Sequence, residues 1–92
     1  MDSDSVLADT VTNYLAQLAT HASPATVAAY RQDLSAFCQF AEQRGITQAS
    51  ALDTALARAF LGVERSRGLA PRSLARRRAA LSRFADALVQ HR

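Results

Sequence analysis

The sequence predicts a single all-α domain, a four-helix orthogonal bundle with short loops. Three observations predict it. Apolar residues recur at spacings of three and four in four separate segments. Proline and glycine stand between these segments at positions typical of helix starts and ends. No strand-like alternation, internal repeat or low-complexity stretch occurs. A chain of 92 residues forms one small domain, which buries about two-thirds of its unfolded surface.

The first helix is expected to follow a flexible tail formed by residues 1–5. Ser5 is the candidate N-cap, and the helix should end in the polar turn around residues 20–22. Its apolar face contains Leu7, Val11, Tyr14, Leu15 and Leu18.

The second helix is predicted over residues 24–44, with Ser23 as N-cap, Pro24 at its first position and Gly45 as its stop. The apolar stripe contains Val27, Tyr30, Leu34, Phe37, Phe40 and Ala41. The opposite face is built from alanine, serine and glutamine. Such a face can lie close against another molecule or be an inert alanine-rich surface, and the residues alone favour the inert surface.

A connector follows over residues 46–52, with room for one helical turn. Asp53 or Thr54 can cap the third helix, which Gly68 ends. The fourth helix should begin at Pro71. Its N-cap would be Ala70, which costs about 1 kcal/mol relative to serine.

The fourth helix has two contrasting faces. Leu74, Leu81 and Leu88 share one stripe, whereas Arg72, Arg76 and Arg83 line the opposite side. A helix that packs its apolar face on a core and exposes arginines, with small alanines between them, is suited to bind a polyanion such as nucleic acid. The alternative is an ordinary solvated surface, which is what most charged runs are. The residues expected in the core are Tyr14, Leu15, Leu34, Phe37, Phe60, Leu74, Leu81 and Leu88.

The net charge of +3 hides an asymmetry along the chain. Residues 1–64 carry three arginines and seven acids, giving −4, whereas residues 65–92 carry eight arginines and one acid, giving +7. The last third therefore indicates an acidic partner. Nucleic acid is favoured over a membrane, because the basic helix lacks the flanking aromatic residues of an interfacial helix.

Several classes of site find no support. The one cysteine, Cys38, excludes an internal disulfide and is expected to be a small buried apolar residue. The two histidines, His21 and His91, have no ligand spacing, so no metal or cofactor is expected. Neither a signal peptide nor a membrane-length apolar run occurs, which favours a cytoplasmic protein. Neither a membrane nor a small-molecule substrate is expected as a partner.

Two phrases of the sequence are more specific than its composition. The segment SPATVAAYRQDL, residues 23–34, fits the pattern SP-x-T-(x)3-Y-x-x-D-L. The segment GLAPRSLARR, residues 68–77, is followed by ALSRF at 80–84. These phrases resemble, in order and at the right separation, the two signature phrases of one domain of the tyrosine recombinases of the phage-integrase family, and the Xer type most closely. Two such phrases together are a specific signal.

This resemblance implies a SAM-like core-binding domain over residues 6–92, with the catalytic domain absent from this chain. In the family this domain is half of a clamp around duplex DNA at the recombination core site. Its second and fourth helices meet the major groove, and other helices help to assemble the recombinase tetramer. The DNA-binding positions carried over are Thr26, Ala29, Tyr30, Arg31, Arg72, Ser73, Arg76, Arg77 and Arg83. Because Tyr30 lies on the apolar stripe, we expect a buried ring with only its hydroxyl reaching outward.

The resemblance also implies what this chain does not do. The family uses a tyrosine nucleophile with arginines, a lysine and histidines to form a phosphotyrosine link. Tyr14 and Tyr30 both lie on core stripes and no His-x-x-Arg phrase occurs, so the chain by itself is not expected to be an enzyme.

Two positions depart from the family pattern. Ala70 often corresponds to serine, and Arg78 often corresponds to leucine. Arg78 lies inside the apolar stripe, so either its stem packs along the core edge with the guanidinium in water, or it faces a neighbouring domain. The first alternative is favoured.

The leading hypothesis is therefore a DNA-binding domain of a site-specific recombinase, acting in strand exchange such as chromosome dimer resolution. The alternative is a helical protein–protein interaction module whose arginines bind an acidic partner. A self-contained enzyme is the weakest hypothesis, for lack of a convergent set of catalytic side chains.

Overall fold

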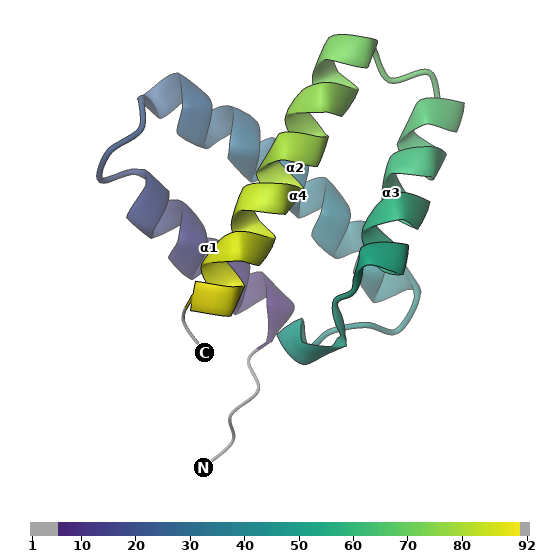
Figure 1. Ribbon diagram of the computed structural model, residues 1–92, viewed down its shortest axis with the longest axis horizontal. Helices are drawn as coiled ribbons and strands as arrows, with labels where there is room; N and C mark the ends of the chain where they lie inside the picture. Colours follow the sequence, from purple (N-terminus) through teal and green to yellow (C-terminus); the bar gives the residue numbers. More distant parts are fainter. Residues whose placement is uncertain (1–5, 91–92) are drawn as a thin grey trace.

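The computed structural model describes residues 6–90 and shows four α-helices with one short 3-10 turn (Figure 1). The elements are α1 (Leu7–Leu18), α2 (Pro24–Gln43), η1 (Ala49–Ala51), α3 (Thr54–Ser66) and α4 (Pro71–Gln90). Within residues 6–90 there is no β-strand. The predicted all-α class and the four-helix bundle are thus confirmed, and the helical turn expected in the connector is η1.

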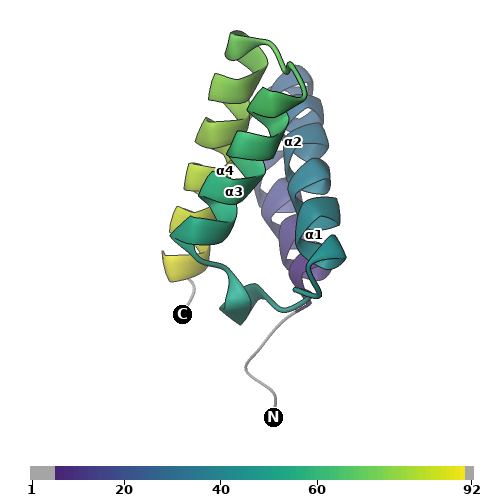
Figure 2. The same ribbon diagram turned by 90° about the vertical axis from the view of Figure 1, so that its right-hand side faces the viewer.

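The helices form two layers of two. Figure 2 shows α3 and α4 side by side, packed over the layer of α1 and α2. In Figure 1, α4 crosses over α2 near the middle of both helices. This crossing places the first half of α4 next to α2, which matters for the site below.

Side-chain caps begin two of the helices, as predicted. The Ser23 hydroxyl accepts a hydrogen bond from the Thr26 amide at 3.2 Å, and Pro24 holds the first position of α2. Of the two candidates for α3, Asp53 is the cap, since its Oδ1 accepts from the Leu56 amide at 2.8 Å. The local sequence therefore determines where α2 and α3 begin.

Left-handed glycines end the same two helices. Gly45 and Gly68 have φ of 77° and 88°, a conformation that favours glycine because it lacks a Cβ. After Gly45, the Ile46 amide donates to the Ala41 carbonyl at 3.0 Å, which closes a Schellman motif. The predicted stops are thus confirmed.

The start of α1 differs from the prediction. Ser5 lies outside the described residues, and Val6, which makes no side-chain cap, holds the N-cap position. The chain instead uses backbone bonds to the connector. The Leu7 amide donates to the Thr47 carbonyl at 2.8 Å, and Val6 forms an isolated antiparallel bridge with Gln48.

Aromatic side chains fill the centre of the bundle. Phe60 of α3 packs against Phe37 and Phe40 of α2, with ring centroids 5.4 Å apart in both pairs. Tyr14 of α1 meets Phe84 of α4 edge-on at 5.5 Å. These contacts join α2 to α3 and α1 to α4, and aromatic pairs of this kind contribute about 0.5–1.5 kcal/mol beyond their buried area.

The core matches the expected residues closely. Of the eight, five are buried, and Tyr14, Leu74 and Leu88 are partly buried against the same cluster. Cys38 is buried, as expected, and this burial raises the pKa of its thiol from 9.0 to about 11, with a smaller contribution from nearby Glu42. Phe84, which is 1% exposed, was not among the expected core residues.

Candidate nucleic-acid interface

The first half of α2 contributes small and polar side chains at the surface. Thr26 is half-buried, and its hydroxyl accepts a hydrogen bond from the Ser23 hydroxyl at 3.0 Å. Ala29 is half-buried and Arg31 is exposed. Tyr30 is buried, so its ring belongs to the core, in line with the expectation for that side chain. The described residues of this part of α2 therefore form a surface of short side chains with one exposed arginine, Arg31, that makes no ion pair.

Helix α4 carries most of the charge. Arg72 and Arg83 are exposed, and Ser73 is half-buried. Burial and the nearby Tyr30 raise the pKa of the Tyr14 phenol, and Arg83 lies close enough for its charge to oppose that rise. Arg83 therefore stands over the seam between α1 and α4, while Arg72 stands at the start of α4.

A buried ion network joins α2, α3 and α4. Asp33 of α2 is 0% exposed and accepts two hydrogen bonds from Arg76, through Nε and Nη2, both at 2.8 Å. Arg77 Nε donates to the same carboxylate at 3.2 Å, and Arg77 Nη1 donates to Glu64 of α3. Two carboxylates thus neutralise two neighbouring arginines of α4.

This network changes the expected roles of two arginines. Arg77, expected at the DNA surface, is 8% exposed and bonded to carboxylates on two helices, so it holds the helices together. The Arg76 side chain is 36% exposed, and its bond to Asp33 raises the pKa of the guanidinium further above its ordinary value. The free part of the arginine stripe is therefore smaller than the sequence indicates.

Sequence reasoning missed Asp33 and Glu64 as parts of this site. The available signal was their position, since Asp33 lies one turn from Tyr30 and Phe37 on the buried side of α2, where an acid needs a partner. In the described part of the chain, no buried side-chain nitrogen or oxygen lacks a hydrogen-bond partner.

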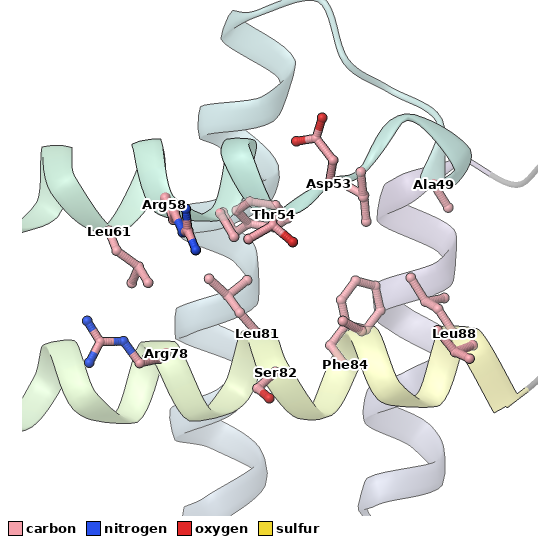
Figure 3. Close-up of a pocket in the computed structure, with 15 residues that line it drawn as sticks. Ala49, Asp53, Thr54, Arg58, Leu61, Arg78, Leu81, Ser82, Phe84 and Leu88 are labelled. Carbon is pink, nitrogen blue, oxygen red and sulfur yellow. The ribbon is translucent and has the colours of Figure 1, made fainter.

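A second surface feature is an apolar groove between α3 and α4 (Figure 3). It has a volume of about 500 Å³, and its walls include Leu52, Leu81 and Leu88. Arg58 and Arg78 flank the end marked by Leu61, as Figure 3 shows. Arg78 is exposed while lining this groove, which agrees with the favoured interpretation that its stem packs at the core edge.

The described residues contain no cluster of three or more histidine, cysteine or acidic side chains suited to a metal ion. Among the helices described, none is both long and apolar enough to span a bilayer.

The model of the family described as phage integrase, N-terminal SAM-like domain, matches residues 9–92 of the chain. The chain belongs to this family. The resemblance noted in the sequence is thereby confirmed, and the domain described above is an integrase-type SAM-like domain.

Its relatives point to the Xer type. The domain is 62% identical over 80 residues to tyrosine recombinase XerC of Chromohalobacter salexigens, covering 87% of this chain and 27% of that protein. It is 37% identical over 75 residues to XerC of Xanthomonas campestris pv. campestris, covering 82% of this chain and 23% of that protein. The chain thus spans about a quarter of the length of these relatives.

A solved structure supports the fold. The crystal structure of the N-terminal domain of a phage integrase/site-specific recombinase from Haloarcula marismortui superposes with a TM-score of 0.90 at 22% identity. The match covers 97% of this chain and 86% of that one.

Proposed function

We propose that this domain binds duplex DNA at the core site of a site-specific recombinase, using α2 and α4. The observation that carries the proposal is the set of exposed arginines along these two helices, in a family of recombinase domains. Arg31, Arg72 and Arg83 would neutralise phosphates, and half-exposed Arg76 would join them. Ala29, small and half-buried on the same helix as Arg31, would allow the backbone of α2 to approach the DNA closely.

The other candidate residues would support this surface. Thr26 and Ser73, both half-buried polar residues near the helix starts, suit hydrogen bonds to phosphate oxygens. Tyr30 and Arg77 are buried, so we assign them to the packing beneath the surface. In this arrangement the surface positions the protein on DNA, and few side chains remain for base readout.

We further propose that the domain acts within a larger cytoplasmic tyrosine recombinase of the XerC type, in strand exchange such as chromosome dimer resolution. The 62% identity to an XerC protein supports this assignment. The phosphotyrosine chemistry would come from elsewhere in that protein, because both tyrosines of this domain pack in its core cluster.

The isolated chain should therefore form no covalent adduct with DNA. After incubation with a duplex and denaturation, no slower-migrating protein–DNA band is expected on a gel. A denaturant-resistant band that disappears in Tyr14→Phe or Tyr30→Phe would contradict the proposal.

The salt dependence of binding tests the DNA surface directly. Each lost phosphate contact should flatten the slope of log K against log [salt] by about 0.9. We expect this change for Arg72→Ala and for Arg83→Ala, measured by fluorescence anisotropy on a duplex of about 30 base pairs, long enough for several contacts. Arg44→Ala is the control, because Arg44 stacks over Phe40, 3.8 Å from the ring centroid, at the far end of α2. Unchanged slopes in both variants would remove α4 from the DNA interface.

A second candidate function is protein–protein interaction, and the α3–α4 groove is the observation that favours it. Arg58 and Arg78 have no carboxylate partner within residues 6–90, and apolar walls lie beside them. The groove would suit an apolar segment with an acidic residue, and another recombinase subunit of a DNA-bound tetramer is the partner we propose. Arg78→Glu should then weaken subunit association on DNA without changing the salt slope of a single domain, as measured by gel mobility shift.

A further inference from the structure

Asp33 is an unusual neighbour for a DNA-binding surface. A carboxylate beside a phosphate-binding helix repels DNA, so simple charge counting makes Asp33 unfavourable for binding. Its side chain nevertheless grips Arg76 with two hydrogen bonds of 2.8 Å while being fully buried. The charges of Arg76, Arg77, Asp33 and Glu64 sum to zero, so two of the positive charges of α4 are neutralised within the domain.

The geometry of the Asp33–Arg76 pair leaves part of the guanidinium available. A guanidinium has five N–H groups in a fixed plane, and the pair uses one on Nε and one on Nη2. Three N–H groups therefore remain, including both on Nη1. Since 36% of the Arg76 side chain is exposed, these remaining groups can meet an acceptor arriving from outside.

The other arginine of the network reinforces this arrangement. Arg77 binds the same Asp33 carboxylate and also Glu64, which ties α2 and α3 to the same turn of α4. Asp33 is thereby held from two sides, and its own orientation is fixed. A free arginine loses the entropy of its long side chain on binding a phosphate, whereas a pre-oriented one loses less.

We infer that Asp33 is a positioning residue for DNA binding, which orients Arg76 so that its outer edge meets a phosphate. This inference rests on the proposed DNA-binding function. Asp33 does not touch DNA in this arrangement; it acts through Arg76.

The sign of the effect of Asp33→Asn tests the inference. If Asp33 is only a negative charge near DNA, removing it makes the domain more positive, and binding should tighten. If Asp33 positions Arg76, binding should weaken about 3- to 10-fold, the cost of ordering one long side chain. Affinity is measured by anisotropy on the same duplex at fixed salt, with circular dichroism confirming the helical fold.

Asp86→Asn is the matched control. Asp86 is an exposed acid of α4 and makes no ion pair with any described residue. The same substitution there should leave binding unchanged or tighten it slightly. Weakening in Asp33→Asn with no weakening in Asp86→Asn supports the inference, and tightening in both overturns it.

A second pair of variants keeps the test valid if Asp33→Asn does not fold. Arg76→Lys keeps the charge and a partner for Asp33 but loses the planar fork. We expect an unchanged salt slope with about 3- to 10-fold weaker binding. Arg44→Lys, at an exposed arginine outside the proposed DNA surface and without an ion pair among the described residues, should bind like the parent chain. Equal affinities of Arg76→Lys and Arg44→Lys overturn the inference.

These outcomes separate the inference from the function on which it rests. If Arg72→Ala and Arg83→Ala flatten the salt slope but Asp33→Asn tightens binding, the DNA surface stands and the positioning role fails. If neither arginine variant changes the slope, the proposed function itself fails.

Discussion

Helix α4 packs against α2 and against α3 in different ways. Toward α2 it presents Arg76 and Arg77, which Asp33 holds through directional bonds. Toward α3 it presents a single ion pair, Arg77 to Glu64, and farther along the helix Leu81 beside an incompletely filled groove. Apolar burial stabilises a contact without fixing its orientation, whereas hydrogen bonds between charged groups require a particular geometry. The ion network centred on Asp33 therefore fixes how α4 is oriented, whereas the apolar part of the α3 side leaves room for another molecule.

Removing the carboxylate at the α2 side should have the largest effect on stability. Asp33→Ala leaves Arg76 unpaired and Arg77 buried with Glu64 alone. Breaking a buried ion pair from one side costs about 3–5 kcal/mol, so the free energy of unfolding should fall by that amount in a urea titration. Asp86→Ala, at an exposed position, should change it by about 0.5 kcal/mol or less. Equal effects would show that the network does not stabilise the fold.

Truncating a leucine at the α3 side should have a smaller effect. Leu81→Ala should lower the free energy of unfolding by about 2–3 kcal/mol, because the adjoining groove lets water fill the space. Leu34→Ala is the comparison, since Leu34 is 0% exposed and enclosed at the centre of the bundle. It should cost about 1–2 kcal/mol more, because a closed cavity remains. A larger loss of unfolding free energy for Leu81→Ala than for Leu34→Ala would contradict the interpretation that the groove between α3 and α4 is open to solvent.

A third prediction concerns a buried group on α2 that has no cationic partner. Burial raises the pKa of Cys38 from 9.0 to about 11, so the folded state keeps the thiol protonated where the unfolded state loses its proton. The effect of Cys38 on the free energy of unfolding is therefore constant below pH 9. Between pH 9 and about 11 the free energy of unfolding falls, because only the unfolded state releases the thiol proton there. The free energy of unfolding should fall by about 2 kcal/mol between pH 8 and pH 10.5 through this group.

Cys38→Ala isolates that contribution. The difference between the two unfolding free energies should shrink by the same amount over this range, as measured by urea titrations at each pH. A constant difference would mean that the thiol ionises equally well in both states.

The fold was accessible from the sequence because each of its signals is local. Ser23, Asp53 and the two left-handed glycines mark helix ends through bonds to residues fewer than six positions away. The apolar stripes are likewise a property of single helices, so the core followed from them. Phe84 was missed because its role as the partner of Tyr14 depends on how α1 and α4 cross.

The candidate site was less accessible for the same reason. Asp33 and Arg76 are 43 positions apart, and only the crossing of α2 and α4 brings them together. A helical wheel places Arg76 on the basic face but cannot show that a carboxylate occupies two of its N–H groups. The two matched phrases contained Asp33 and both arginines without indicating that they bond.

The bridge between Val6 and Gln48 has a consequence for the opening motions of the domain. The first amides of a helix normally lack a backbone acceptor and exchange their hydrogen readily. The Leu7 amide instead donates to Thr47, in the segment between α2 and α3. Its exchange with solvent deuterium therefore requires the connector to separate from α1, and its rate reports that separation rather than fraying of one helix end.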